Sequence, residues 1–302
     1  MNSIKNFNEL VQHLSGSTSR KKVAVVWPAD HSSPIALAQA LENGIIDVVA
    51  VGYPQAVEQE PLCRFADRIT CVEASDPDDA ARRAVALARE GKVDIIMKGL
   101  INTDNLLHAV LNKENGILPR GRVLTHITAG EIPGYDRLLF FSDVAVIPYP
   151  TQEQRIEQVR YMVATCHNFG IDCPKIALIH CTEKPNEKFF PFTLGYSDII
   201  EMGKQGEFGP CIIDGPLDLK TACDKHALEA KGLKSPLEGE SDAVIFPDIE
   251  AGNVFYKAVT LFAKAEVAAI LQGTTVPVVL PSRGDSPQSK FFSLALAAMC
   301  AK

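Results

Sequence analysis

The sequence contains eight cysteines but no Cys-x-x-Cys pair, the close spacing that zinc sites commonly use. The cysteines are scattered, and several lie in or beside apolar runs, as the reduced thiols of cytosolic proteins do. We therefore expect a cytoplasmic protein with no metal site.

Long apolar runs and basic runs are also absent. A membrane-spanning helix needs about 20 apolar residues, and no stretch approaches that length. The first residues, MNSIKNFNELVQHL, form an amphipathic pattern rather than a signal peptide. The net charge of −7 argues against a nucleic-acid surface. Neither a membrane nor a nucleic acid is expected as a partner.

Two common nucleotide-binding motifs are missing. The chain has no G-x-x-x-x-G-K-[ST] loop and no G-x-G-x-x-G turn after a strand-like run. A P-loop and a standard dinucleotide-binding turn are therefore disfavoured.

What the chain does contain is a regular alternation of strand-like and helical patterns over its 302 residues. This alternation predicts an α/β protein whose mostly parallel sheets are covered on both faces by helices, with ligands at the carboxyl ends of the strands. Helices are expected over 34–43, from Pro77 to Gly91 after an Asp76 cap, and over 151–170. Strands are expected over 22–27, 47–52, 94–99, 144–147, 174–180, 211–214, 243–246 and 276–280.

The stretch from Val276 to Lys290, VPVVLPSRGDSPQSK, has the features of an anion site. A strand is followed by a polar turn and then by a helix, which Asp285 or Ser286 can cap and which has Pro287 at its first position. Backbone N–H groups and the helix dipole favour an anion there, and Arg283 can hold phosphate through two parallel hydrogen bonds. The alternative is an ordinary loop in which Arg283 pairs with a surface carboxylate.

Other polar residues near predicted strands also have structural alternatives. His126 is the best-placed imidazole after a strand, but a histidine beside Val123 and Leu124 can also be a hydrogen-bonded core residue, which we favour. The segment 214–216, Asp-Gly-Pro, has the composition of a turn, and we interpret it as one. The segment 250–253 is expected in a loop or a first helical turn, where its polar groups either line a cleft or serve as caps.

Six segments carry a more specific pattern through their order and spacing. They are 94–107 (DIIMKGLINTDNLL), 121–127 (GRVLTHI), 134–146 (GYDRLLFFSDVAV), 214–219 (DGPLDL), 241–257 (SDAVIFPDIEAGNVFYK) and 276–290. Together they resemble the phosphate acetyl/butyryl transferases, most closely the phosphate butyryltransferase branch.

The resemblance implies two mostly parallel, three-layer α/β domains with a cleft between them, as in the isocitrate and isopropylmalate dehydrogenases. One domain would comprise residues 1–133 and 273–302, and the other residues 134–272. The chain would form a homodimer or a higher homo-oligomer. The implied reaction is the reversible transfer of a short-chain acyl group, butyryl favoured over acetyl, from acyl-CoA to inorganic phosphate. The coenzyme A thioester would then be a substrate, and the resemblance implies no permanently bound cofactor.

At the level of residues, the resemblance places the family's Ser-Arg pair on Ser282 and Arg283. In acetyl-transferring members an Asp six residues after this Arg is a proposed general base. Ser289 occupies that position here, so the role does not carry over. The expected catalytic residues are Ser282, Arg283 and Asp285, and the expected phosphate- and CoA-binding residues are Gly284, Ser286, Ser289, Arg122, His126, Lys98 and Asn253.

The chemistry needs a phosphate oxygen to attack a thioester carbonyl, so a doubly charged nucleophile must be held beside a developing oxyanion. The second pKa of phosphate lies near neutrality, roughly 6 in monoesters, so a strong base is not required. If a base acts, Asp285 or His126 could supply it, and we favour a capping role for Asp285.

Two other classes of protein share the expected architecture. One is a small-anion binding protein without catalytic activity, which the missing secretion signal disfavours. The other is an oxidoreductase, which would need a cluster of aspartates to bind a metal.

Overall fold

The computed structural model describes residues 2–282 and 284–302. Its contacts divide the chain into two compact units. We call Phe7–Leu124 with Val267–Lys302 the terminal unit, and Met1–Asn6 with Thr125–Glu266 the central unit. The expected α/β class is confirmed. The sequence predicted two domains with boundaries at 133/134 and 272/273. The two units are groups of contacts rather than independently folding domains, so these boundaries stay a prediction.

The terminal unit contains a sheet of order β3-β2-β1-β4-β11-β10. Neighbouring strands are parallel except for β10 and β11, which are antiparallel. The strands are β1 (Lys21–Val26), β2 (Ile46–Val51), β3 (Ile69–Val72), β4 (Ile95–Lys98), β10 (Glu266–Gln272) and β11 (Val278–Val279). The last four residues of β1, 23–26, and all four residues of β4 are buried, as expected for strands covered on both faces.

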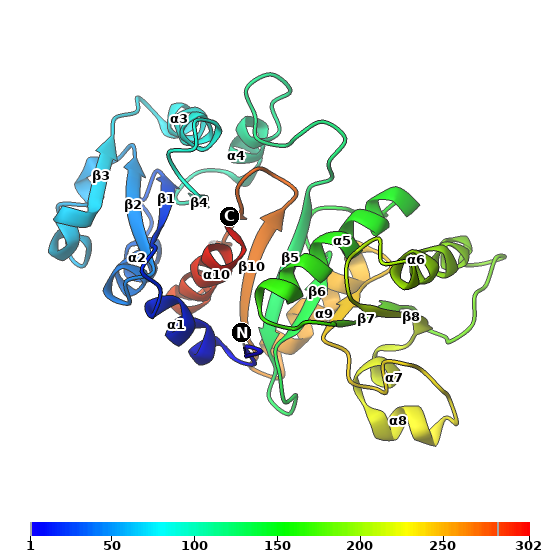
Figure 1. The fold of residues 1–302 in the computed structure, drawn as a ribbon. Coiled ribbons are helices and arrows are strands. Elements are labelled where there is room, and N and C mark those ends of the chain that lie inside the picture. The colour runs from blue at the N-terminus through cyan, green and yellow to red at the C-terminus, as the bar shows by residue number, and fades with distance from the viewer. Residues whose placement is uncertain (1, 283) are drawn as a thin grey trace. The chain divides into compact units, whose positions relative to one another are not determined.

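Helices cover both faces of this sheet (Figure 1). One face carries α1 (Phe7–Ser15), α2 (Ser33–Glu42) and α10 (Pro287–Cys300), and the other carries α3 (Pro77–Arg89) and α4 (Thr103–Val110). Short 3₁₀ helices, η1 (Pro54–Ala56) and η2 (Leu62–Arg68), follow β2.

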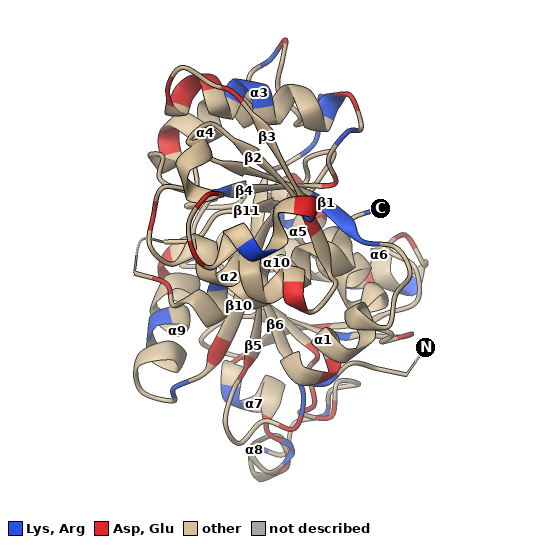
Figure 2. Cartoon of the chain, turned by 90° about the vertical axis from the view of Figure 1, so that its left-hand side faces the viewer, with Lys and Arg blue, Asp and Glu red and all other residues tan. Residues whose placement is uncertain are grey.

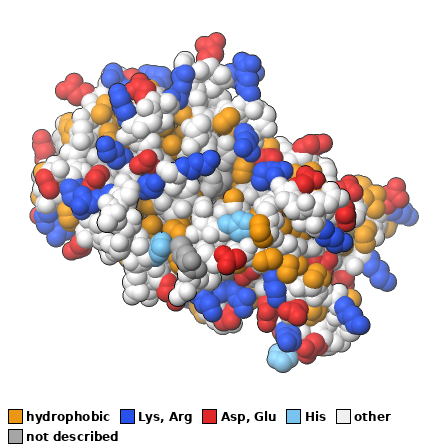
Figure 3. Space-filling view, in the orientation of Figure 1, with side chains coloured by type: hydrophobic (Ala, Val, Ile, Leu, Met, Phe, Trp, Pro, Cys, Tyr) orange, Lys and Arg blue, Asp and Glu red, His pale blue; other side chains and the backbone are white. Residues whose placement is uncertain are grey.

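Helix α3 begins as the sequence predicts. The side chain of Asp76 accepts the N–H of Asp79 as an N-cap, and Pro77 is the first helical residue. Figure 2 shows both charge signs on α3, and Figure 3 shows Lys and Arg side chains among Asp and Glu side chains on the surface around it. Arg83 pairs with Asp79 at 2.8 Å, a surface ion pair of small energetic weight.

The central unit contains a sheet of order β5-β6-β9-β7-β8, with only β5 and β6 antiparallel among the described pairs. Its strands are β5 (Thr125–Glu131), β6 (Leu139–Ser142), β7 (Lys175–Ile179), β8 (Ile212–Leu217) and β9 (Ala243–Ile245). Its helices are α5 (Gln152–Asn168), η3 (Pro191–Leu194), α6 (Gly195–Lys204), α7 (Leu219–Cys223), α8 (Lys225–Ala230) and α9 (Ile249–Leu261).

Two adjacent phenylalanines of β6 show how this sheet is covered. Phe140 contacts Phe169, just after α5, edge-on at 4.9 Å between ring centroids. Phe141 contacts Phe255 of α9 at 5.1 Å on the other face. Because successive strand side chains point to opposite faces, the central unit also has three layers. Among the described residues, no helix is long and apolar enough to cross a membrane.

The prediction of a strand over 144–147 is wrong. Its N–H groups are bound to a carboxylate instead of a neighbouring strand, with Asp143 Oδ1 accepting from Ala145 (2.8 Å) and Val146 (2.9 Å). The other oxygen, Oδ2, accepts from Ile147 at 3.3 Å. The strand is β6, which ends one residue before Asp143.

Two further local predictions are wrong. The segment 214–216 is not a turn but lies within β8, where Asp214 pairs with Ala177 and the register then shifts before Ile179. The predicted strand over 276–280 is reduced to the two residues of β11. Pro277 and Pro281 flank it, and neither has an N–H to continue the ladder.

Candidate active site

The strand order of the terminal unit reverses beside β1. Strand β2 lies on one side of β1 and β4 on the other, so the loops after β1 and β4 leave the sheet in opposite directions. Ligands of open α/β sheets bind at this switch point, outside the carboxyl ends of the strands. A Cβ at Gly99, directly after β4, would collide with the backbone oxygens of Trp27 and Val26. Glycine is therefore needed at 99 for the two loops to come this close.

Two pockets lie at this edge and share one wall. We call the first the polar pocket; it has a volume of about 380 Å³ and is lined by Lys98, Ile101, Asn102, Thr103, Leu280, Pro281 and Ser282. We call the second the switch pocket; it has a volume of about 330 Å³ and is lined by Ala29, Asp30, His31, Ser32, Lys98, Gly99, Leu100, Pro281, Ser282 and Lys290. The shared wall consists of Lys98, Pro281 and Ser282.

The shared wall includes the end of β4 and the loop after β11. Lys98 is the last residue of β4 and only 5% exposed, with its Nζ 3.5 Å from the carbonyl oxygen of Gly99. Ser282, in the loop after β11, is exposed and lines both pockets. The sequence predicted both residues as site residues, and the structure brings them together.

The loop after β11 is closed by Asp285. Its Oδ2 accepts the N–H of Ser282 at 2.8 Å, and its own N–H donates to the carbonyl of Ser282 at 3.2 Å. The N-cap of α10 is Ser286, whose Oγ accepts the N–H of Ser289 at 3.1 Å. The predicted capping role of Asp285 is therefore wrong, because its carboxylate is turned back to the start of the loop. Arg283 lies outside the described residues.

We expect Asp285→Asn to keep turnover within about tenfold of wild type, because an amide oxygen accepts the Ser282 N–H as a carboxylate does. Asp285→Ala should cost more, since it leaves that N–H without its acceptor and loosens the loop. Steady-state rates for both variants, with thermal melts as the control for folding, test this. A loss of about 10²–10⁴-fold in Asp285→Asn at unchanged stability would instead identify Asp285 as a general base.

A helix N-terminus faces the polar pocket. Helix α4 begins at Thr103, and its N-cap residue, Asn102, makes no side-chain capping hydrogen bond. Both residues line the pocket. The first N–H groups of a helix carry partial positive charge, so this end of α4 favours an anion together with Lys98.

An ion pair at the switch pocket was not predicted from the sequence. Lys290 is 4% exposed, and its Nζ lies 2.8 Å from Asp30 Oδ1 and 3.1 Å from Ser33 Oγ. Burial alone would raise the pKa of Asp30, but hydrogen bonds from Lys290 and Ser33 outweigh it and lower the pKa to about 2. The pair fixes the loop after β1 to the first turns of α10. In the sequence, Asp30 could have been noticed as a carboxylate just after the first strand. Its partner Lys290 could not, because the two residues are 260 positions apart.

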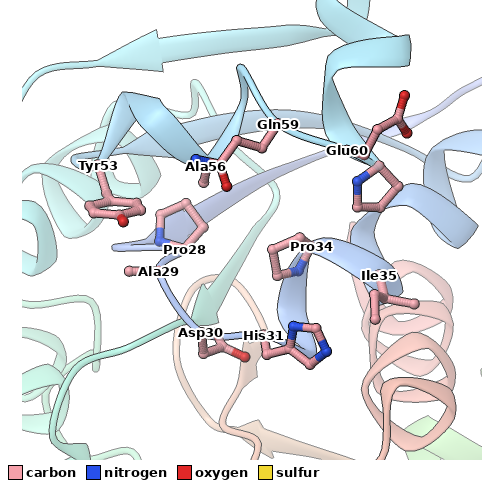
Figure 4. Close-up of a pocket in the computed structure, with 11 residues that line it drawn as sticks. Pro28, Ala29, Asp30, His31, Pro34, Ile35, Tyr53, Ala56, Gln59 and Glu60 are labelled. Atoms are coloured by element: carbon pink, nitrogen blue, oxygen red, sulfur yellow. The ribbon is translucent and has the colours of Figure 1, made fainter.

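A third pocket, of about 560 Å³, adjoins the switch pocket and shares Ala29, Asp30 and His31 with it. Figure 4 shows Asp30 and His31, from the loop after β1, across the pocket from Gln59 and Glu60, which follow β2. We call this the outer pocket. Its size lies in the usual range for small-molecule sites, which is about 300–1,000 Å³.

Other predicted residues of the terminal unit line none of these pockets. A Cβ at Gly284 would have no atom within 4 Å, so no steric contact requires glycine there. Arg122 is exposed, and a Cβ at Gly273, in the hairpin between β10 and β11, would collide with the carbonyl oxygen of its neighbour Val123. That hairpin lies at the opposite end of β11 from Ser282.

Two predicted residues belong to the central unit. His126 lies within β5 rather than after a strand, and it is 8% exposed. Its ring Nδ1 is 3.3 Å from Thr128 Oγ1, and its backbone N–H donates to Asp143. Asn253 lies in α9 and donates to the carbonyl of Val144 at 3.0 Å. The binding roles of His126 and Asn253 stay predictions.

No group of three or more His, Cys, Asp or Glu among residues 2–282 and 284–302 could hold a metal ion. What the terminal unit offers is a cation and a helix N-terminus beside a serine, at the junction of a polar and a more apolar pocket. This arrangement can bind an anion next to an uncharged group and stabilise negative charge that develops between them.

Comparison with known proteins agrees with this chemistry. The chain matches the family model described as Phosphate acetyl/butaryl transferase over residues 66–298. It is 39% identical over 300 residues to the Phosphate butyryltransferase of Clostridium acetobutylicum, covering 99% of both chains. A crystal structure of a branched-chain phosphotransacylase from Enterococcus faecalis V583 has a TM-score of 0.81 and 29% identity, and the match covers 93% of this chain and 98% of that one.

A more distant match bears on the fold alone. The 4-hydroxythreonine-4-phosphate dehydrogenase of Klebsiella pneumoniae has a TM-score of 0.56 at 13% identity, and the match covers 94% of this chain and 100% of that one. The expected likeness to a dehydrogenase fold is confirmed.

Proposed function

The chain belongs to the Phosphate acetyl/butaryl transferase family, and we propose that it reversibly transfers a short-chain acyl group, butyryl favoured, from acyl-CoA to inorganic phosphate. The observation that carries this proposal is the wall shared by the polar and switch pockets. A phosphate on one side of Lys98 and Ser282 and a thioester on the other would meet at these two side chains.

Phosphate is assigned to the polar pocket. Lys98 supplies a buried cation, and the first N–H groups of α4, at Thr103, supply hydrogen-bond donors. Arg283, outside the described residues, stays the predicted two-point phosphate ligand. Held in this way, a phosphate oxygen can approach the carbonyl carbon without first losing the entropy of a bimolecular encounter.

The thioester is assigned to the switch pocket. Its acyl carbonyl would lie at the shared wall, where the Ser282 hydroxyl can donate to the oxygen as it becomes an oxyanion. A phosphate oxygen forms a new C–O bond to the acyl carbon. When the resulting oxyanion collapses, the C–S bond breaks and its electron pair leaves on the thiolate of CoA. The remainder of CoA, as a substrate rather than a bound cofactor, would extend past Asp30 towards the outer pocket.

The short acyl chain would contact Leu100 and Ala29. Leu100 is 44% exposed, although its backbone is anchored by a hydrogen bond to the Trp27 carbonyl at 2.8 Å. Leu100 lines the switch pocket and is partly exposed there, so its side chain is available to contact a substrate. We propose that these side chains set the preferred chain length.

Leu100→Ala is expected to lower kcat/KM for butyryl-CoA by about tenfold while acetyl-CoA changes less than about threefold. The reason is that two methylene groups lose their apolar contact, at about 0.8 kcal/mol each. Parallel assays with both thioesters measure the ratio, and Leu111→Ala, an exposed leucine just after α4 that lines none of the three pockets, is the matched control. Equal losses for both thioesters would show that Leu100 does not contact the chain beyond its first carbons.

The central experiment follows thiol release from acyl-CoA with a disulfide reagent, with and without phosphate. Release should require phosphate, yield one acyl phosphate per thiol, and run backwards from acyl phosphate and CoA. A series from acetyl- to hexanoyl-CoA then ranks chain length. Equal release without phosphate, or a stable acyl group left on the denatured protein, would contradict direct phosphate attack. A cytoplasmic location and a homodimeric or larger assembly remain part of the proposal.

A further inference from the structure

The switch pocket is built from loops that one side chain connects. The loop after β1 supplies residues 29–32, and the loop after β11 supplies Pro281 and Ser282. Helix α10 begins soon after the second loop, and Lys290 lies in its first turns. The Lys290 ammonium reaches the carboxylate of Asp30 in the first loop, so this one side chain ties the two loops together.

The carboxylate of Asp30 organises the loop that Lys290 reaches. Its Oδ1 accepts the N–H of Ser32 at 3.2 Å and the N–H of Ser33 at 2.9 Å. These bonds orient the start of α2, whose N-cap residue, Ser32, makes no side-chain capping hydrogen bond. The same Oδ1 accepts from the Lys290 ammonium, which also lies 3.1 Å from Ser33 Oγ. One cation therefore fixes both the loop after β1 and the start of α2.

This ion pair borders two pockets. Residues 29–31 line both the switch pocket and the outer pocket, and Pro34 and Ile35 of α2 line the outer pocket as well. Among residues 2–282 and 284–302, the two buried lysines are Lys98 and Lys290, and both line the switch pocket. A buried ion pair adds little net stability over an apolar pair of similar volume, but the loss of one partner leaves a costly unpaired charge. The pair therefore matters more for the position of the loop than for the stability of the fold.

We propose that Lys290 is a positioning residue for the acyl-CoA substrate, acting through Asp30 and the loop after β1, and that phosphate binding does not depend on it. The inference rests on the proposed function, in which the thioester occupies the switch pocket and the remainder of CoA extends past Asp30. None of residues 29–35 lines the polar pocket. Release of the loop would therefore disturb the thioester site and leave Lys98 and the N-terminus of α4 in place.

The kinetic test uses Lys290→Met, which removes the cation at nearly constant volume. In the phosphate-dependent thiol-release assay, this variant should raise KM for butyryl-CoA at least about tenfold, because the unpaired Asp30 carboxylate turns towards water and moves the loop. The KM for phosphate and kcat should stay within about threefold of wild type, since the polar pocket and Ser282 are unchanged.

A second substitution tests whether the effect passes through Asp30. Asp30→Asn, added to Lys290→Met, should bring the KM for butyryl-CoA back towards wild type, because a neutral amide can stay in the loop without a cation and its oxygen still accepts the N–H of Ser33. General damage to α10 would not be repaired by a change at residue 30. A double variant with a KM as high as that of Lys290→Met would contradict the positioning role.

Arg68→Met is the matched control for an effect of stability alone. Arg68 is a partly buried cation of the same unit, lies 2.9 Å from Asp47, and lines none of the polar, switch and outer pockets. Both Arg68→Met and Lys290→Met should lower the melting temperature, but only Lys290→Met should change the KM for butyryl-CoA. The same rise in KM for Arg68→Met would show that lost stability, and not the loop, is responsible.

Hydrogen–deuterium exchange follows the loop without relying on activity. In Lys290→Met the amides of residues 29–35 should exchange faster than in wild type, while those of residues 101–103 at the polar pocket stay unchanged. Saturating CoA should slow exchange at 29–35 in the wild type. Unchanged exchange at 29–35 in the variant, or an equal rise in KM for butyryl-CoA and for phosphate, would overturn the inference. A wild type that releases no thiol in the presence of phosphate would instead refute the proposed function on which the inference rests.

Discussion

Ser282→Ala is expected to lower kcat by about 10²–10³-fold, which is the usual cost of removing one hydrogen-bond donor to a developing oxyanion. The hydroxyl lies on the wall that the two pockets share, between the sites assigned to phosphate and to the thioester. The backbone of Ser282 should not move in the variant, because its N–H and its carbonyl are both bound to Asp285. The loss would thus report on the hydroxyl and not on the loop.

The kinetic constants of Ser282→Ala distinguish the two groups to which the Ser282 hydroxyl can donate, the thioester carbonyl oxygen and phosphate. A hydroxyl that donates to the carbonyl oxygen acts mainly in the transition state, so kcat and kcat/KM fall together. A hydroxyl that binds ground-state phosphate instead gives a raised KM for phosphate at nearly constant kcat. Initial rates over a grid of phosphate and butyryl-CoA concentrations distinguish these cases. A change smaller than about twofold in every constant would remove Ser282 from the site.

Much of the fold could be predicted because local pattern and tertiary structure agree. Strands β1, β2, β4 and β7 are short apolar runs between helical segments, and each lies within a residue or two of the expected bounds. Helix α5 begins with a complete capping box, in which Thr151 and Gln154 exchange hydrogen bonds, and this signal is visible in the sequence alone.

The failures occur where hydrogen bonds that composition does not show decide the backbone. The segment 144–147 has a strand-like composition, but the carboxylate of Asp143 binds its N–H groups before another strand can. The segment 214–216 has turn residues, but pairing with β7 keeps it in β8. The first outcome depends on a local carboxylate turn that the apolar composition of 144–147 conceals, and the second depends on a neighbouring strand that only the tertiary fold supplies.

The same reasoning explains which site residues were found. Ser282 and Lys98 are polar residues at the ends of recognisable strands, so strand order alone brings them together. Asp30 and Lys290 were missed because, in the sequence, each has the appearance of an ordinary charged surface residue. Only the packing of α10 beside α2 buries the Lys290 ammonium against the Asp30 carboxylate.

Lys98→Met should lower kcat/KM for phosphate by about 10²–10³-fold while the protein remains folded. Lys98 is the buried cation between the two pockets, and a charge-assisted hydrogen bond to phosphate is worth roughly twice a neutral one. Methionine fills nearly the same volume without charge, so the free energy of unfolding should change by less than about 1.5 kcal/mol. Activity and stability are therefore expected to separate.

Phosphate-dependent thiol release and thermal melts, measured on the same preparations, test that separation for Lys98→Met. Lys92→Met, at an exposed lysine just before β4, is the matched control and should match wild type in both measurements. Lys98→Arg keeps the charge but needs more room at a buried position, so it should recover only part of the activity.

If Lys98→Met loses activity only in proportion to a lost fraction of folded protein, then Lys98 is structural and the polar pocket is not the phosphate site. A normal KM for phosphate in a stable variant would lead to the same conclusion, because a buried cation in contact with a doubly charged ligand cannot be removed without weakening its binding.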